Sequence, residues 1–213
     1  MARSKRPYRW LKPVSHVALA APLLWIVWQW GAAILGEPHA LGFNAIETTI
    51  RFLGDTAIRV LLVALAVTPV SWALGWKPMM QIRRLTGLWA FAYTLLHFFA
   101  YFGMEQIFSI GLLWEDVLKR KYITLGMTAI VLLIPLAVTS TNKMVRRVGA
   151  KRWQTLHKSV YIIGVLAVFH HWFMVKGVQL APIMHGLILF ILLLMRVLRW
   201  QIRQRRKKAV VAT

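Results

Sequence analysis

The stretch HKSVYIIGVLAVFHHWFMV, residues 157–175, indicates both the fold class and the chemistry of this chain. Its length approaches the roughly 20 residues that an α-helix needs to cross the apolar core of a bilayer. It also carries three histidines, His157, His170 and His171. Ionisable side chains are costly within a membrane span, so these histidines are candidates for a functional site.

Five more apolar segments of similar length lie outside this stretch. Together, the six predicted spans cover residues 14–35, 56–75, 86–104, 122–141, 157–175 and 178–198. Of the 213 residues, 59% are hydrophobic and only 15% are charged, whereas a soluble domain is typically about a quarter charged. The sequence therefore predicts an all-α integral membrane protein, a single domain over 1–213 that ends in a basic tail, 199–213.

Most of the basic residues lie in the predicted loops, the N-terminal arm and the tail. The chain has 27 Lys and Arg but only 6 Asp and Glu, a formal net charge of +21. With six spans, 20 of these basic residues fall in the N-terminal arm, the second and fourth loops and the tail, and 5 fall in the opposite loops. The positive-inside rule then places both termini in the cytoplasm and accounts for the charge without nucleic acid. Asp55 and Arg59, at the start of the second predicted span, are expected to form an interfacial ion pair.

The absence of cysteine restricts the redox chemistry. It excludes disulfides, thiolate-bound iron–sulfur clusters and the C-x-x-C-H attachment of a c-type haem. A metal or redox centre in this chain must therefore use histidine, methionine, tyrosine or carboxylate ligands.

Two histidines on different spans are predicted to lie at similar depth. At 1.5 Å per residue, His97 lies about 16 Å into the third span from its inner end. His170 lies about 20 Å beyond His157, in the outer half of the fifth span. His157 and His16 are both expected near the inner surface.

Two neutral imidazoles from facing helices can bind a haem iron from both sides and leave no open position, which favours electron transfer. A second centre near His157 would complete a route across the membrane. At 100° per residue, however, a straight helix places His171 rather than His170 on the face of His157, so periodicity alone leaves that choice open. Gly164, midway between the two levels, would let a macrocycle approach the helix or would allow close helix packing.

Several motifs resemble the MsrQ (YedZ) family. They are RRLTGLWAFAYTLLH (83–97), KRWQTLHKSVYIIGVLAVFHHW (151–172), SHVALAAPLLWIVW (15–28), VTPV (67–70) and LAVTSTNKM (136–144). The family comprises b-haem subunits of the bacterial inner membrane and belongs to the ferric-reductase-like transmembrane superfamily. The resemblance implies that electrons pass from the quinone pool or a cytosolic flavin reductase to a periplasmic MsrP-like molybdoenzyme, which reduces methionine sulfoxide in oxidised periplasmic proteins.

The resemblance also implies a ligand set. His97, His157 and His170 match the family's haem histidines, which favours His170 over His171. The related oxidases carry two histidines on each of two helices, but this chain has Arg83 and Arg84 where the inner histidine of the third span would be. His16 or a bound FMN is therefore a candidate for completing the inner site, with Arg83, Arg84 and Arg152 as partners for propionates or a phosphate.

The predicted function is thus electron transfer, through one or two b haems, with the sulfoxide chemistry left to the partner. A second hypothesis is a quinone-linked b-type cytochrome subunit of a different reductase or dehydrogenase. A third is a histidine-based proton or metal transporter. An assembly scaffold is a further alternative, because each histidine taken singly is as consistent with packing as with ligation.

Overall fold

The computed structural model describes residues 8–175, 177 and 179–211, and every regular element in that part of the chain is helical. The prediction of an all-α protein is therefore confirmed. Arg3, Lys5, Arg6 and Lys176, which entered the charge count, lie outside the described residues, as do the side chains of Arg206 and Lys207. The α-helices are α1 (Leu11–Ile34), α2 (Ala45–Ala73), α3 (Arg83–Ala100), α4 (Ile110–Lys119), α5 (Lys121–Val138), α6 (Asn142–Val148), α7 (Ala150–Leu156), α8 (Val160–Met174) and α9 (Leu180–Val211).

Three short elements connect these helices. They are the 3₁₀ helices η1 (Lys77–Gln81) and η3 (His157–Ser159) and the π-helical turn η2 (Tyr101–Glu105). The π turn continues α3 directly beyond the turn that holds His97. Such π turns within α-helices often mark functional sites.

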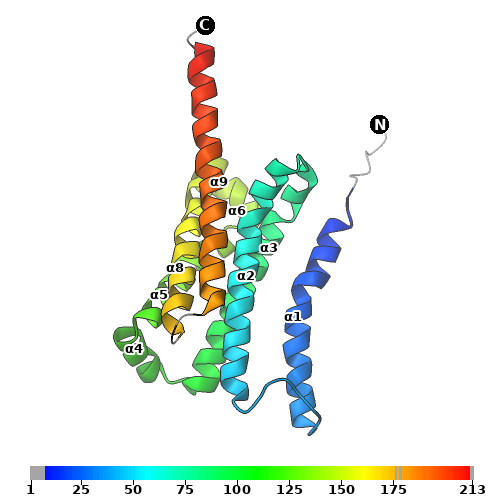
Figure 1. The fold of residues 1–213 in the computed structure, drawn as a ribbon, viewed down its shortest axis with the longest axis vertical. Coiled ribbons are helices and arrows are strands. Elements are labelled where there is room, and N and C mark those ends of the chain that lie inside the picture. Colours follow the sequence, from blue (N-terminus) through cyan, green and yellow to red (C-terminus); the bar gives the residue numbers. More distant parts are fainter. Residues whose placement is uncertain (1–7, 176, 178, 212–213) are drawn as a thin grey trace.

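Helix α2 lies at the centre of the bundle (Figure 1). It packs against α3, α8 and α9, while α5 packs against α8 and α3. Buried residues lie all around α2, because neighbours cover most of its faces, whereas α1 buries only Leu11, Ile26 and Ala32. Helix α1 therefore stands at the edge of the bundle.

A tyrosine joins α1 to α3 at a proline. Pro22 has no N–H and disturbs the hydrogen bonds of α1. The hydroxyl of the fully buried Tyr93 donates to the carbonyl oxygen of Leu19 at 2.6 Å and accepts from the N–H of Leu23 at 3.2 Å. It therefore satisfies two backbone groups that would otherwise pair with each other one helical turn apart. A second contact joins α1 to α2, where Trp30 Nε1 donates to Thr49 Oγ1 at 2.9 Å.

Four helical segments in the described part of the chain are long and apolar enough to cross a membrane. They are Leu11–Ile34, Arg83–Glu105, Lys121–Val138 and Leu180–Arg205. The other two predicted spans correspond to α2, which is the central helix, and to η3 with α8, which together cover His157–Met174.

The boundaries differ from prediction most at α2 and α9. Helix α2 begins at Ala45 rather than at residue 56, because Asn44 caps it by accepting a hydrogen bond from the N–H of Glu47 at 3.1 Å. Asp55 and Arg59 are indeed paired, at 3.5 Å, but the pair lies well inside the helix rather than at its start. Helix α9 continues through the predicted basic tail to Val211.

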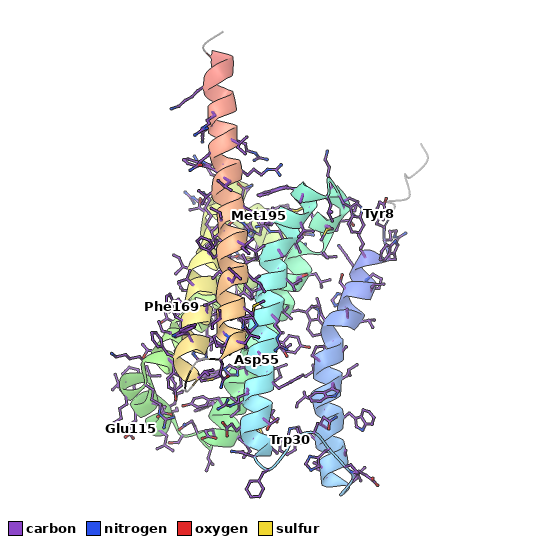
Figure 2. The ribbon with its side chains drawn as sticks, in the orientation of Figure 1. Tyr8, Trp30, Asp55, Glu115, Phe169 and Met195 are labelled. Carbon is purple, nitrogen blue, oxygen red and sulfur yellow. The ribbon has the colours of Figure 1, made fainter. Side chains whose placement is uncertain are left out.

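The start of α1 and the end of α9 lie at the same end of the bundle (Figure 1). Figure 2 shows Tyr8 and Met195 toward this end, and Trp30 and Glu115 toward the other. Helices α6 and α7, which carry Arg146, Arg147 and Arg152, follow the end of α5 at the first end. We call the first end the basic end and the second the α4 end.

Candidate functional site

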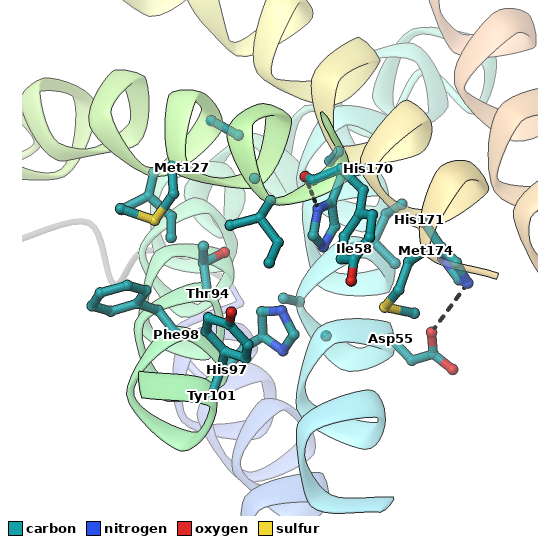
Figure 3. Close-up of a pocket in the computed structure, with 18 of the residues that line it drawn as sticks. Asp55, Ile58, Thr94, His97, Phe98, Tyr101, Met127, His170, His171 and Met174 are labelled. Atoms are coloured by element: carbon teal, nitrogen blue, oxygen red, sulfur yellow. Dashed lines mark hydrogen bonds and ion pairs between the residues drawn. The ribbon is translucent and has the colours of Figure 1, made fainter. Parts of the chain in front are cut away.

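A pocket of about 150 Å³ lies toward the α4 end, enclosed by α2, α3, α5 and α8. We call it the outer pocket. Its walls are mostly apolar, and three histidines line it: His97 on α3 and the adjacent His170 and His171 on α8 (Figure 3). The rings of His97 and His170 are the pair that lie close together. Apolar lining residues include Ala57, Ile58, Leu61, Phe98, Ile123, Met127, Ala129, Ile130, Leu133, Ile163 and Ala167.

The two imidazoles are held in matching ways. His97 Nδ1 lies 2.9 Å from the carbonyl oxygen of Ile50, and His170 Nδ1 lies 2.7 Å from that of Tyr122. A carbonyl can only accept, so each Nδ1 carries the hydrogen and each Nε2 keeps a lone pair. This second hydrogen bond is the one that typically fixes the tautomer and orientation of a metal-binding histidine.

Two glycines give these rings their space. A Cβ placed on Gly54 of α2 would lie 3.0 Å from the His97 ring, and one on Gly126 of α5 would lie 2.9 Å from the His170 ring. Any side chain at either position would therefore push an imidazole out of place. Each ring lies against the bare backbone of the helix that faces it.

The spacing fits a metal ion bound between the rings. The ring centres of His97 and His170 are 6.1 Å apart, with their planes at 78°. Bonds from a metal to an imidazole nitrogen are about 2.0–2.1 Å long, so two rings on opposite sides of one metal have centres roughly 6 Å apart. An apolar pocket with one neutral imidazole on each side suits a haem iron with both axial positions filled.

A second pocket, of about 290 Å³, lies toward the basic end, and we call it the inner pocket. His157 is the one histidine lining it among the described residues, together with Arg83, Arg84 and Arg196. The ring of His157 stacks on Trp153 with centres 3.9 Å apart, and its Nδ1 lies 3.0 Å from the Trp153 carbonyl oxygen. Its Nε2 is buried without a hydrogen-bond partner among the described residues, as expected for a nitrogen that binds a ligand.

Arg196 is a further candidate that the sequence does not single out. It lies near the end of the sixth predicted span, 178–198, and α9 brings it to the wall of the inner pocket. One Nη donates to the Leu192 carbonyl oxygen at 3.0 Å and the other to that of Leu65 at 2.5 Å, and the guanidinium lies 5.3 Å from the centre of the Tyr161 ring. No pattern in the sequence separates it from the other basic residues, because its position depends on how α9 packs against α2.

Of the remaining candidates, His16 and Arg152 lie apart from the two pockets, whereas Arg84 lines the inner one. His16 is exposed on α1, where its Nδ1 accepts a hydrogen bond from Trp89 Nε1 at 3.1 Å, and it does not line the inner pocket. Arg152 is also exposed and does not line that pocket. Arg84 lines it while donating to Asn142 Oδ1 at 2.7 Å.

The neighbours His170 and His171 point in different directions. His170 is joined to α5 through Tyr122, whereas His171 lies 3.3 Å from His185 of α9 and 3.6 Å from Asp55 of α2. One straight helix from His157 would place His171 on the same face as His157. Residues 157–159 instead form a 3₁₀ turn before α8 begins. Gly164 lies against Leu189 of α9 and Leu65 of α2, so its small size allows close helix packing.

The two pockets are neighbours along the bundle axis. Leu61 of α2 and Leu133 of α5 line both of them. His157 and His170 are 13 residues apart, which corresponds to about 20 Å along the helix direction. The arrangement can therefore hold two redox groups in sequence between the two ends of the bundle.

The chain is similar to several known proteins. The family described as "Ferric reductase like transmembrane component" matches residues 53–168, which include His97 and His157. The haem-binding subunit MsrQ of a protein-methionine-sulfoxide reductase from Caulobacter vibrioides is 42% identical over 97% of both chains. The subunit of the same name from Rhodospirillum rubrum is 45% identical over 89% of this chain and 88% of its own. The magnetosome protein MamZ of Magnetospirillum gryphiswaldense is 33% identical over 93% of this chain but only 31% of its own length.

Proposed function

Because this chain belongs to the MsrQ family of ferric-reductase-like transmembrane proteins, we propose that it is the haem-binding membrane subunit of a methionine sulfoxide reductase system. In this role it carries electrons through b-type haem to a periplasmic MsrP-like molybdoenzyme. That partner, rather than this chain, reduces methionine sulfoxide in oxidised periplasmic proteins.

The pairing of His97 with His170 carries the proposal. Both Nδ1 atoms donate to backbone carbonyls, both rings line one apolar pocket, and the ring centres lie at the spacing that a shared iron requires. A haem held there supplies reversible one-electron chemistry at its iron. His97 and His170 would hold the iron from both sides and leave no position for a substrate, which favours electron transfer over oxygen binding.

The chain's own residues hold and orient the group. The carbonyl oxygens of Ile50 and Tyr122 fix the two imidazoles, while Gly54 and Gly126 leave room for them. The apolar wall formed by α2, α5 and α8 keeps water away. Such a shell stabilises the neutral ligand set and tunes the reduction potential of the site.

We infer that the inner pocket holds the second cofactor, either a second haem or FMN. His157 offers an unpaired nitrogen, and Arg83, Arg84 and Arg196 offer guanidinium groups suited to propionates or a phosphate. The electrons come from the quinone pool or from a cytosolic flavin reductase. Arg152, which lies outside the pocket wall, is the weakest of the arginine candidates.

The proposed topology has six spans within one ferric-reductase-like domain, 1–213, in the bacterial inner membrane. The start of α1 and the end of α9 share one end of the bundle, as an even number of crossings requires. That end carries most of the basic residues, so we assign it to the cytoplasm and the α4 end to the periplasm.

Reconstitution tests this function directly. The chain, purified in lipid nanodiscs, is mixed with a periplasmic molybdoenzyme of the MsrP type and a protein substrate containing methionine sulfoxide. We expect sulfoxide reduction to require the chain, a reductant and the molybdoenzyme together. Efficient reduction by the chain alone, or no transfer from the reduced chain to the molybdoenzyme, would contradict the proposal.

A further inference from the structure

A second cluster of ionisable side chains lies at the edge of the outer pocket, where two of its members, Asp55 and His171, form part of the wall. It consists of Asp55 and Arg59 on α2, His171 on α8 and His185 on α9. His171 Nε2 lies 3.6 Å from Asp55 Oδ1, and Nδ1 of His171 lies 3.3 Å from Nδ1 of His185. Figure 3 shows His171 and Asp55 joined beside Met174, at the edge of the pocket that holds His97 and His170.

This cluster opens to the flank of the bundle. His171 and His185 are buried, but the Asp55 side chain is 33% exposed and that of Arg59 is 59% exposed. The residues next to the two histidines in sequence, Trp172 and Met184, are exposed and apolar, as on a lipid-facing surface. A carboxylate and a guanidinium partly open to the apolar phase are costly to maintain, and residues of this kind within a span generally serve a function.

The cluster contains acidic and basic side chains, which a haem that only passes electrons does not need. Electron transfer between two metal centres requires no acid or base. A carboxylate beside two linked imidazoles can accept hydrogen bonds from hydroxyl groups and take up a proton. Such groups are useful beside a redox centre when the donor loses protons together with its electrons. A donor that enters from the flank of a bundle in a bilayer must also dissolve in lipid.

We propose that the cluster of Asp55, His171 and His185 is the oxidation site for a hydroquinone lipid that donates electrons to the outer pocket. The inference rests on the proposed function and names where one of its two electron donors binds. One hydroxyl of the hydroquinone hydrogen-bonds to the Asp55 carboxylate, and an imidazole nitrogen of the histidine pair binds the other end of the head group.

Oxidation of the hydroquinone to the quinone releases two protons and two electrons. One O–H bond breaks first, its proton passes to the Asp55 carboxylate, and one electron would reduce a ferric haem held by His97 and His170. The second O–H bond breaks after Asp55 has released its proton and the haem has passed its electron to the molybdoenzyme, so that both acceptors are available again. The protons leave from Asp55 toward the α4 end, which lies on the periplasmic side in the proposed topology.

Under this proposal, the two pockets serve different electron donors. Electrons from a hydroquinone enter beside the outer pocket and reach the periplasmic side without passing the inner one. His157 is then needed only for electrons that arrive from the cytoplasm. Under this proposal, each of the two donors has a separate entry point.

The test uses the haem-loaded chain in nanodiscs and decylubiquinol as the hydroquinone probe. Stopped-flow absorbance measures the rate of haem reduction by decylubiquinol and, separately, by dithionite, which needs no binding site. Calorimetry measures the affinity for decylubiquinone. The variants are Asp55→Asn and His185→Gln, and the matched control is Glu115→Gln, which alters an ion-paired carboxylate of α4 at the same end of the bundle.

We expect Asp55→Asn to slow reduction by decylubiquinol at least tenfold and to weaken decylubiquinone binding several-fold. His185→Gln should act in the same direction with a smaller effect. Haem content and the dithionite rate should remain unchanged in both variants, and Glu115→Gln should match the wild type in every measurement. If Asp55→Asn loses haem, the test rests on His185→Gln. Its affinity for decylubiquinone and its rate of haem reduction by decylubiquinol then decide whether the cluster binds the hydroquinone.

Two outcomes overturn the inference: variants that decylubiquinol reduces as fast as the wild type, or a haem-loaded wild type that it does not reduce. Both leave the proposed function intact, because the haem is present. A folded wild type without haem contradicts the proposed function itself and is recognised from its absorption spectrum before any quinol is added.

Discussion

The outer and inner pockets differ in how they are equipped to hold a cofactor. In the outer pocket, the rings of His97 and His170 lie at matched spacing in a mostly apolar wall. The inner pocket has one imidazole, whose Nε2 has no partner among the described residues, and three arginines. The outer pocket would therefore supply both axial ligands of an iron by itself, whereas the inner pocket is suited to an anionic group held mainly by charge.

This difference shows which parts of the chain determine each site. In the outer pocket, the two proposed ligands depend on backbone features, two carbonyl oxygens and two glycines, which place the rings with little freedom. In the inner pocket, long arginine side chains from α3 and α9 meet near His157. The outer site should therefore be sensitive to small changes, and the inner site should respond to changes of charge.

The largest expected effect comes from removing an outer ligand. His97→Ala or His170→Ala should abolish haem binding in the outer pocket, because each removes one of two axial ligands. Absorption spectra and the ratio of haem to protein measure the loss. His171→Ala is the control and should retain the haem. Loss of haem in His171→Ala together with retention in His170→Ala would show that the adjacent histidine is the ligand.

The glycine contacts provide the next test. Gly126→Ala should lower outer haem occupancy severalfold, because its Cβ would lie 2.9 Å from the His170 ring. Gly54→Ala should act similarly through His97. Gly31→Ala in α1 is the control, since nothing lies within 4 Å of a Cβ there. Normal occupancy in both variants would mean that the rings do not depend on these close approaches.

Changes of charge should separate the inner pocket from the outer one. We expect Arg196→Gln to weaken binding of the inner cofactor several-fold and to leave the outer haem spectrum unchanged. The measurement is cofactor content after purification, with Arg203→Gln on the exposed part of α9 as the control. An equal loss from both pockets would show that Arg196 acts through helix packing rather than by binding an anion.

The smallest effect is expected from His16→Ala. His16 is exposed and hydrogen-bonded to Trp89, so its removal should leave the occupancy of both pockets unchanged. His157→Ala is the matched comparison and should remove the inner cofactor if His157 binds it. Inner cofactor loss in His16→Ala would instead identify this residue as the missing second ligand.

The all-helical fold and the proximity of His97 to His170 could be predicted from the sequence, because both follow from hydrophobic length and depth along helices. Other features required the packed structure. The sequence does not show that Gly54 and Gly126 face the two rings, since this depends on how α2 and α5 meet α3 and α8. Nor does it show that Arg196 lines the same pocket as His157, or that Asp55 of α2 lies beside His171 of α8. Side-chain direction on a helix depends on the neighbouring helices, which periodicity within one span does not reveal.

Low-temperature electron paramagnetic resonance of the oxidised chain in nanodiscs identifies the axial ligands of a ferric haem, so it can decide whether His97 and His170 share one iron. If they do, we expect a low-spin signal of the bis-imidazole type that disappears when either histidine is replaced by alanine. A high-spin signal from a haem with an open axial position, or a bis-imidazole signal that survives both replacements, would contradict this pairing.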